Sequence, residues 1–299
     1  MGWELIFTDS SWYYVGSFNN SIIGNVITDN PIGVGFWFAS NNLVCDNVVA
    51  NNSYGFKFLY NQYQITGSSI DNRIFQNNIA NAIQVEYEQE YANNWDNGIE
   101  GNNWSDYNGT DSDHDGIGDT AHIIDANNTD NYPLMGMFSD FNATSELHVQ
   151  TVCNSRICDF QFNGTAIMFN VTGVGGTTGF CRICIPTALM NDTFMVFVNG
   201  TEILPSPEPL PCSNSTHIYL YFAYSHSTQE VIIIPEFPSL IILPLFMIAT
   251  LLAVIFHRRK DHILSSMMEK KGFCGRYFHS MWVQFPSQTF QDVSKREHI

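Results

Sequence analysis

The most regular pattern in the chain is an alternation of Asn and aliphatic residues that appears in two windows 22 positions apart and begins again in a third. The window Asn20-x-Ile22-x-x-Asn25-x-Ile27-x-x-Asn30 returns as Asn42-x-Val44-x-x-Asn47-x-Val49-x-x-Asn52, and a third window begins Asn72-x-Ile74-x-x-Asn77-x-Ile79. Apolar residues spaced two apart between polar corners indicate short strands, and a period of about 20 residues is typical of a solenoid. We therefore predict a parallel β-helix over residues 19–85, with equivalent Asn side chains stacked in ladders.

The repeat comprises barely three coils, and a β-helix needs about three coils and caps to bury its core. Gly2-Trp3-Glu4-Leu5 fits the interior of a coil, so the sequence opens within one. Met1–Asn20 has neither a basic segment nor an apolar run long enough for a signal peptide. We therefore expect the native protein to extend further toward its N terminus, where earlier coils and an export signal would lie.

A different pattern, short apolar–polar alternation with frequent turns, covers residues 145–234. It predicts an antiparallel, Ig-like β-sandwich. The expected strands are Ile167–Val171, Phe180–Ile185, Phe194–Val198, His217–Tyr224 and Val231–Ile234. Asn199-Gly200 is a hairpin signal after the third of these. The predicted domains are therefore 1–137, the end of the β-helix with an Asp-rich loop, and 145–234, the sandwich.

Residues 237–256 contain a long uncharged apolar run, and the basic cluster His257-Arg258-Arg259-Lys260 follows it directly. About 20 apolar residues suffice to cross a bilayer as a helix, so we predict a transmembrane helix there in preference to a buried core helix. The positive-inside rule then places residues 1–236 outside the cell and the basic tail, 257–299, in the cytoplasm. The expected location is the cell envelope, with a single pass through the membrane.

The distribution of charge supports this topology. The formal net charge of −17 divides into −21 for residues 1–256 and +4 for the tail. A segment as acidic as residues 1–256 repels the phosphates of nucleic acids, which excludes nucleic acid as a partner. Eleven Asn-x-Ser/Thr sequons, all before the apolar run, are expected glycosylation sites on an exported surface: Asn19, Asn51, Asn103, Asn108, Asn127, Asn142, Asn163, Asn170, Asn191, Asn199 and Asn214.

An Asp-rich loop after the coils carries the clearest candidate chemistry. Asp111-Ser-Asp113-His-Asp115-Gly116-Ile117-Gly118-Asp119 places carboxylates at alternate positions before a Gly turn, as in a calcium loop of the EF-hand type. The expected calcium ligands are Asp111, Asp113, Asp115, Ile117, Asp119 and Asp125. His122 occupies the position of the usual bidentate Glu, and Asp125 or Asp130 could replace it. The alternative is a solvated acidic turn without an ion.

Six of the seven cysteines precede the apolar run, and five of them lie in the sandwich region. In an oxidising exterior we expect one or two disulfides there, or buried thiols. The Cys153-x4-Cys158 and Cys181-x2-Cys184 pairs could suggest zinc, but residues three apart on a strand face opposite sides.

Two stretches of the sequence resemble known families. The Asn/Gly coils together with Asn94–Gly98, Gly101–Tyr107, Asp115–Thr120 and Asp130–Leu134 resemble the end of a NosD-type domain, also described as carbohydrate-binding and sugar-hydrolysis repeats of archaeal surface proteins. This resemblance implies a right-handed β-helix and covers roughly residues 2–135. The motif Pro235-Glu236-Phe237, before the apolar run and basic cluster, is similar to an archaeal PEF sorting signal, which implies processing by an archaeosortase. The 39 residues after Lys260 depart from that signal, so a retained anchor is equally compatible.

The function predicted from these features is structural, adhesive or carbohydrate-binding, with Trp37, Tyr54 and Tyr60 as platforms for sugar rings. An enzyme acting on polysaccharides is the alternative, with its catalytic coils in a missing N-terminal part. Glu86, Glu88 and Glu90 align on one strand face but lack an opposing acid, which disfavours catalysis within this chain. Copper handling is less favoured, because the His residues are scattered.

Overall fold

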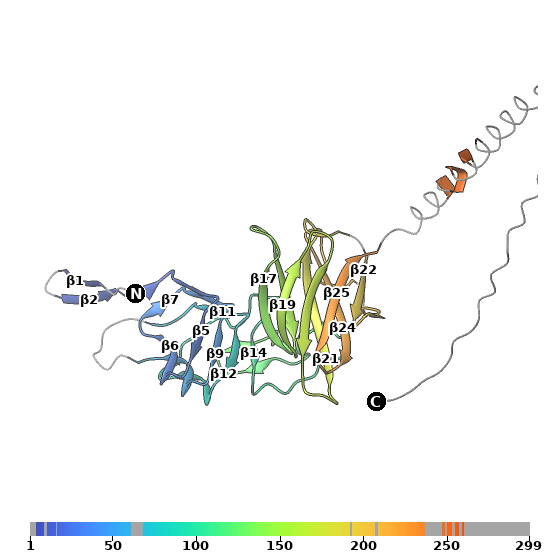
Figure 1. The fold of residues 1–299 in the computed structure, drawn as a ribbon. Helices are drawn as coiled ribbons and strands as arrows, with labels where there is room; N and C mark the ends of the chain where they lie inside the picture. Colours follow the sequence, from blue (N-terminus) through green and yellow to red (C-terminus); the bar gives the residue numbers. More distant parts are fainter. Residues whose placement is uncertain are drawn as a thin grey trace, which may run out of the picture. The chain divides into compact units, whose positions relative to one another are not determined.

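The computed structural model describes residues 4–8, 11–15, 17–60, 68–191, 193–206 and 209–236, and eight positions between 247 and 259. Residues 1–236 form one compact unit and residues 237–299 another. Figure 1 shows the first unit as short stacked strands followed by the longer strands of a two-sheet domain. The chain is therefore mainly β, as predicted.

Three coils of parallel strands form the β-helix. The first contains β4 (Ser21–Ile23), β5 (Val26–Thr28) and β6 (Ile32–Phe36); the second β8 (Leu43–Cys45), β9 (Val48–Ala50) and β10 (Tyr54–Phe58); the third β11 (Arg73–Phe75), β12 (Asn78–Ala80) and β13 (Ile83–Tyr87). Equivalent strands pair in three parallel sheets, in the orders β11-β8-β4, β14-β12-β9-β5 and β13-β10-β6. A partial fourth coil contributes β14 (Asn103–Trp104), and β3 (Ser17–Phe18) pairs with β7 (Ala39–Ser40).

The predicted Asn ladders are confirmed along all three corners of the coils. At each step the backbone N–H and the Nδ2 of one Asn both donate to Oδ1 of the equivalent Asn in the next coil. The ladders run Asn20–Asn42–Asn72–Asn93, Asn25–Asn47–Asn77–Asn102 and Asn30–Asn52–Asn81, and they end at Asn128, Asp130 and Gln84 respectively. In the interior of the stack, these hydrogen bonds satisfy backbone N–H groups and side-chain amides at the corners that would otherwise be buried without partners.

Aromatic and aliphatic residues fill the bore of the β-helix. The rings of Phe36, Phe58 and Tyr87 stack from coil to coil, with centroids 4.4 and 4.3 Å apart. Trp95, fully buried, packs edge-on against Phe56 and closes the bore beside Trp104. The stack follows directly from the repeat, because strands in register place equivalent side chains about 4.8 Å apart.

Glu4 and Leu5 are the described part of the coil interior predicted for Gly2–Leu5, and they lie in a hairpin instead. β1 (Glu4–Thr8) and β2 (Ser11–Val15) pair antiparallel, with Ile6 opposite Tyr13 and Phe7 opposite Trp12. β-branched and aromatic residues directly opposite one another favour this hairpin.

The second domain consists of two antiparallel sheets. One sheet has the order β17-β18-β21-β24 and the other β19-β20-β25-β22-β23. The strands are β17 (Met137–Asn142), β18 (His148–Cys153), β19 (Arg156–Phe162), β20 (Ile167–Thr172), β21 (Thr178–Pro186), β22 (Phe194–Val198), β23 (Thr201–Ile203), β24 (His217–Ser225) and β25 (Gln229–Pro235). All five predicted strands are present, and β17 precedes the predicted start at residue 145.

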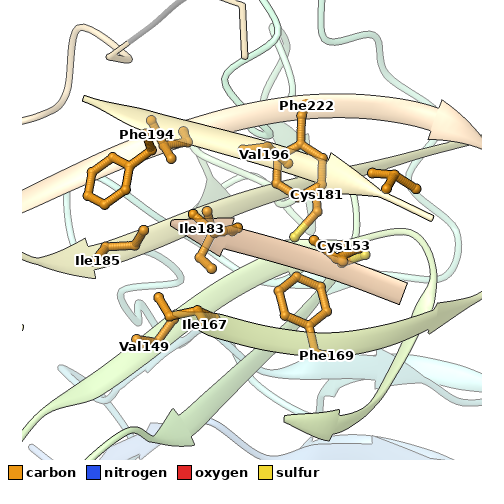
Figure 2. Packing of buried hydrophobic residues seen from close by; sticks show 14 of the residues in the cluster. Val149, Cys153, Ile167, Phe169, Cys181, Ile183, Ile185, Phe194, Val196 and Phe222 are labelled. Carbon is orange, nitrogen blue, oxygen red and sulfur yellow. The ribbon is translucent and has the colours of Figure 1, made fainter. Parts of the chain in front are cut away.

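One apolar core joins the two sheets (Figure 2), with Val149, Ile183 and Phe222 from the first sheet and Ile167, Phe169 and Val196 from the second. The predicted hairpin at Asn199-Gly200 is confirmed, since it connects β22 to β23 with both residues at positive φ. A two-layer sandwich is thus established, and its Ig-like character remains a prediction.

The predicted transmembrane helix, 237–256, lies largely outside the described residues, as does the tail except for Arg259. Within the part of the chain that the structure describes, no helix has the length and apolar character needed to cross a membrane. Pro235 and Glu236 of the sorting motif are described, and Phe237 is not. Glu236 accepts a hydrogen bond from the Thr193 hydroxyl at 2.8 Å.

Candidate metal site

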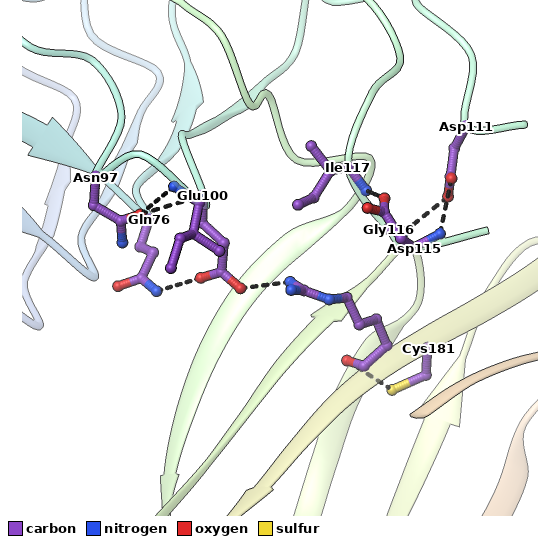
Figure 3. A network of polar contacts seen from close by, with 10 residues as sticks. Gln76, Asn97, Glu100, Asp111, Asp115, Gly116, Ile117 and Cys181 are labelled. Carbon is purple, nitrogen blue, oxygen red and sulfur yellow. Dashed lines mark hydrogen bonds and ion pairs between the residues drawn. The ribbon is translucent and has the colours of Figure 1, made fainter. Parts of the chain in front are cut away.

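The Asp-rich loop lies between β14 and the short antiparallel pair β15 (His122–Ile123) and β16 (Thr129–Asp130). Asp111, Asp113 and Asp115 each bring one carboxylate oxygen within 4.8 Å of the others. We call these three residues the Asp triad. Figure 3 shows Asp111 facing the turn at Asp115 and Gly116. The predicted convergence of alternate carboxylates is therefore present.

Backbone hydrogen bonds preform the loop. Asp111 accepts from the N–H groups of Asp115 and Gly116 at 3.0 Å each, and Asp115 accepts from the N–H of Ile117 at 2.8 Å. Gly116 has φ of +80°, which side-chain-bearing residues rarely adopt. Asp113 is exposed, and its side chain accepts no hydrogen bond from the described residues. Asp113 is thus the triad member whose carboxylate is most available to a ligand.

The electrostatics of the Asp triad favour a cation. Burial raises the pKa of Asp111 and of Asp115, and the Asp113 carboxylate raises both further, while backbone hydrogen bonds oppose the increase. Like charges held this close repel one another, and a divalent ion would relieve that repulsion. An open hollow of about 400 Å³ borders the triad, lined in part by Asp113, Asp115 and Asn131. An ion there would retain access to solvent or to a second ligand.

The other predicted ligands bond elsewhere. Asp119 accepts hydrogen bonds from Thr110 and Ser112, and Asp125 accepts from Asn127 N–H and Asn128. The Ile117 N–H is bonded to Asp115, and Ile117 bridges to Leu134. His122 stacks on Trp104. The structure therefore joins three of the six predicted residues.

Asp130, considered at the sequence level as a substitute ligand, instead ends an Asn ladder. It is fully buried and accepts from Asn102 N–H at 2.7 Å, Trp104 Nε1 at 2.8 Å and Tyr132 N–H at 3.0 Å. Gly101 allows this approach, because a Cβ there would lie 1.7 Å from an Asp130 oxygen. Burial raises the pKa of Asp130 to about 6, against the opposing effect of these hydrogen bonds.

Asp130 should make stability depend on pH. Since its pKa is higher in the folded chain, its contribution is fully present below about pH 4 and is lost as pH rises through 6. A difference of about two pKa units corresponds to at most about 3 kcal/mol. A carboxyl-carbon NMR titration should show midpoints near pH 6 for Asp130 and for Asp46, and only the Asp130 signal should disappear in Asp130→Asn. A midpoint near 4 for this residue would contradict the prediction.

A buried ion pair that the sequence reasoning missed links the two β-domains. Arg182 on β21 bonds through Nη1 to Glu100 Oε1 at 2.5 Å, and the pair is almost completely buried. Gln76 donates to the other Glu100 oxygen, as Figure 3 shows. The Arg182 side chain also passes beneath Gly116, where a Cβ would lie 2.8 Å from Arg182 Cδ. The Arg182 side chain thus packs directly against Gly116, at the turn of the Asp-rich loop.

Of the three glutamates predicted to align on one strand face, Glu86 lies on β13, and Glu88 and Glu90 follow the end of that strand. Lys57, which lies opposite Glu86 on the neighbouring coil, pairs with Glu86 at 3.0 Å and with Glu88 at 3.2 Å. The Lys57 ammonium lowers the pKa of Glu88, secondary to a hydrogen bond from Tyr60 N–H. A glycosidase needs one carboxyl group that stays protonated, and the lowered pKa of Glu88 favours its ionised form instead.

Two of the proposed sugar platforms are accessible. Trp37 and Tyr60 have 43% and 44% of their surface exposed, whereas Tyr54 is half-buried beneath the Lys57 ammonium. Leu59 N–H donates to Phe36 O, so the segments that carry Trp37 and Tyr60 lie on neighbouring coils. Nine of the eleven sequon asparagines are exposed, and Asn103 and Asn170 are half-buried.

Comparison with protein-family models gives a match. Residues 6–109 match the family model described as periplasmic copper-binding protein (NosD). Neither the curated proteins nor the solved structures provide a match. The matched segment includes the three complete coils and ends before the Asp triad. Residues 6–109 are thus similar in sequence to the NosD family, and the strands from Ser21 to Trp104 have the stacked-coil architecture expected from that similarity.

Proposed function

We propose that residues 1–236 form an envelope-exposed β-helix module with a structural, adhesive or carbohydrate-binding role, stabilised by calcium at the Asp triad. The periplasmic description of the matching family supports an envelope location, and the acidic, sequon-rich composition agrees with it. In this proposal residues 237–256 anchor the module to the membrane or are removed by an archaeosortase. The exposed sequon asparagines carry glycans.

The observation that carries the proposal is the all-oxygen character of the Asp triad. Hard cations such as Ca²⁺ prefer carboxylate and carbonyl oxygens, whereas copper prefers imidazole, thioether and thiolate groups. Among the described residues, the Asp triad is the only group of three or more His, Cys, Asp or Glu side chains placed to hold one ion. Copper, which the family description implies, does not fit this donor set. We therefore assign the site to calcium.

Calcium should stabilise the full-length chain. At a concentration about one hundred times the dissociation constant, we expect the melting temperature to rise by roughly 5–10 °C. Asp113→Asn should abolish most of this increase. It should leave the calcium-free melting temperature equal or slightly higher, because Asp113 accepts no hydrogen bond from the described residues and its charge repels Asp111 and Asp115. Differential scanning calorimetry with and without Ca²⁺ measures both quantities.

Asp119→Asn is the matched control for that experiment. This carboxylate holds Thr110 and Ser112 but lies outside the Asp triad. The variant should therefore melt at a lower temperature and keep the full calcium-induced increase. If calcium had no effect on the wild-type chain, or the same effect on Asp113→Asn, the calcium assignment would be wrong.

Carbohydrate binding is expected at Trp37 and Tyr60. An exposed aromatic ring contributes about 0.5–1.5 kcal/mol through stacking, so Trp37→Ala or Tyr60→Ala should weaken binding roughly two- to tenfold. Tyr132→Ala removes a comparably exposed ring in the hollow beside the Asp triad and serves as the control. A glycan array followed by affinity measurement on the best ligand tests this. Equal loss in all three variants would place the sugar elsewhere.

The alternative function, a polysaccharide-acting enzyme, predicts turnover by the same array ligands. The pairing of Lys57 with Glu86 and Glu88 disfavours it in this chain. Glycan binding without any product would support the binding function. A hydrolytic activity that Glu88→Gln abolishes would replace it with the enzymatic one.

A further inference from the structure

Two cysteines in the core of the sandwich face each other across neighbouring strands. Cys153 on β18 is directly opposite Cys181 on the antiparallel strand β21. Both are at most 1% exposed, and Figure 2 shows both within the core between the sheets. All six described cysteines are free thiols in this structure. Of the two alternatives expected from the sequence, disulfides or buried thiols, this structure has buried thiols at this aligned pair.

The pairing geometry meets the requirement for a disulfide. Residues directly opposite in an antiparallel pair have Cα atoms about 4.5 or 5.5 Å apart, depending on the hydrogen-bonding site. Both spacings fall within the range of about 4.4–6.8 Å found in disulfides. The side chains share one face of the sheet, because both belong to the same core cluster. A bond between the two sulfurs would require no change of strand register.

A chain of hydrogen bonds connects Cys153 to the edge of the core. Cys153 Sγ lies 3.4 Å from Tyr224 OH, Tyr224 OH lies 2.8 Å from Ser155 Oγ, and Ser155 Oγ lies 2.8 Å from His226 Nε2. His226 Nδ1 contacts Thr177 Oγ1 at 2.5 Å, and Thr177 Oγ1 contacts Val174 O at 2.7 Å. Five side chains thus form one continuous path.

The direction of proton donation follows from counting protons. Thr177 has a single hydroxyl proton and donates it to the Val174 carbonyl, so Thr177 Oγ1 must accept the proton of His226 Nδ1. The neutral imidazole then accepts at Nε2 from Ser155, which leaves the Ser155 oxygen to accept from Tyr224. The Tyr224 oxygen, in turn, accepts from the Cys153 thiol. The donors of Cys153, Tyr224 and Ser155 therefore all point toward His226.

The same surroundings favour the thiolate form of Cys153. Contact with Cys181 lowers the pKa of Cys153, and the N–H of Ser155 donates to its sulfur at 3.4 Å. Burial raises the pKa of Cys181. Gly173 and Gly179 pack against the His226 ring so closely that a Cβ on either would lie within 3 Å of it. This packing fills the space around His226 and fixes its ring within the network.

We propose that Cys153 and Cys181 are a redox-active pair that small hydroperoxides oxidise to a cross-strand disulfide, with His226 as the proton acceptor. The Cys153 proton passes along Tyr224 and Ser155 to His226. The thiolate attacks the hydroperoxide ROOH and forms the sulfenic acid, and ROH leaves with the proton from His226. The Cys181 thiol then attacks the Cys153 sulfur, the disulfide forms and water leaves. In sum, two thiols and ROOH give one disulfide, ROH and water.

Peptide mapping of the wild-type, full-length chain tests the pair directly. The folded chain is treated with hydrogen peroxide, denatured in acid, alkylated and digested. Cleavage after Arg156 and Arg182 separates Cys153 from Cys181, and additional cleavage after Phe160, Phe162 or Phe169 separates Cys181 from Cys158. We expect one linked peptide pair containing Cys153 and Cys181 and lacking two hydrogen atoms. Recovery of both cysteines as alkylated thiols would overturn the proposal.

The relay is tested by the rate of oxidation. Tyr224→Phe keeps the ring packing and removes the hydroxyl, so the disulfide should form about tenfold more slowly or worse. Cys45 and Cys158 are partly exposed and make no hydrogen bond to this network, so their oxidation rates in the same sample should not change. Equal rates in the wild type and in Tyr224→Phe would refute the role of the relay, and the mapping result would still decide the disulfide.

Discussion

Asn77→Ala should destabilise the first unit by about 3–5 kcal/mol, the largest effect expected from a single side chain of the β-helix. Asn77 is fully buried and donates to the carbonyls of Val44 and Phe75 and to Asn102. It also accepts from Asn47. The alanine variant would leave these groups buried without partners and would open a cavity. Urea unfolding at constant m-value measures the loss.

The control lies in the same ladder. Asn25 occupies the exposed end of that ladder, so Asn25→Ala should cost at most about 1 kcal/mol. Asn77→Asp separates hydrogen bonding from size, because it preserves the volume and points an oxygen at the Val44 and Phe75 carbonyls. It should therefore be as damaging as alanine at neutral pH. A tolerated Asn77→Asp would mean that the ladder contributes little beyond packing.

Breaking the ion pair between Glu100 and Arg182 should lower the free energy of unfolding by about as much as Asn77→Ala does. Glu100→Leu would leave a buried guanidinium without its acceptor, and two of its nitrogens, Nε and Nη2, already lack a hydrogen-bond partner. Removal of one member of a buried ion pair typically costs about 3–5 kcal/mol. Arg182→Leu should lower the free energy of unfolding by a similar amount, because the buried Glu100 carboxylate would retain only the hydrogen bond from Gln76.

The double variant distinguishes the pair from general packing. Glu100→Leu combined with Arg182→Leu removes both charges, so most of the stability should return. We expect a coupling free energy of at least about 2 kcal/mol from the double-mutant cycle. The half-exposed pair of His148 and Asp140 is the control, and His148→Gln should cost under about 1 kcal/mol. Additive losses at Glu100 and Arg182 would contradict a direct role for the ion pair.

The β-helix could be predicted because one short-range rule is repeated along the chain. An Asn at each corner bonds to its equivalent in the next coil, and the apolar residues between corners all face the bore. The spacing between equivalent Asn residues increases from 22 to 30 after the second coil, yet Asn72 and Asn77 rejoin the ladders. Strand register therefore depends on the corners, and the length of the intervening loop matters little.

Other features depend on contacts that no local pattern reveals. Glu100 and Arg182 are 82 positions apart, and each stands alone in its segment. β19 was not predicted because its sequence does not alternate regularly. Its pairing with β20 shifts register between Cys158 and Gln161, where Asp159 has φ of +56°, and this bulge disrupts the two-residue alternation of apolar and polar residues. The Asp triad followed from its alternate spacing, but Asp119 and Asp125 did not join it, because Ile117 bridges to Leu134 directly after the turn.

Calorimetric titration of the full-length chain with Ca²⁺ and, separately, with copper tests the central assignment most directly. We predict one calcium site per chain, a loss of at least tenfold in calcium affinity in Asp113→Asn, and an unchanged affinity in Asp119→Asn. Copper should not compete with calcium for this site. Absence of calcium binding by the wild-type chain, or calcium binding that Asp113→Asn does not weaken, would contradict the account.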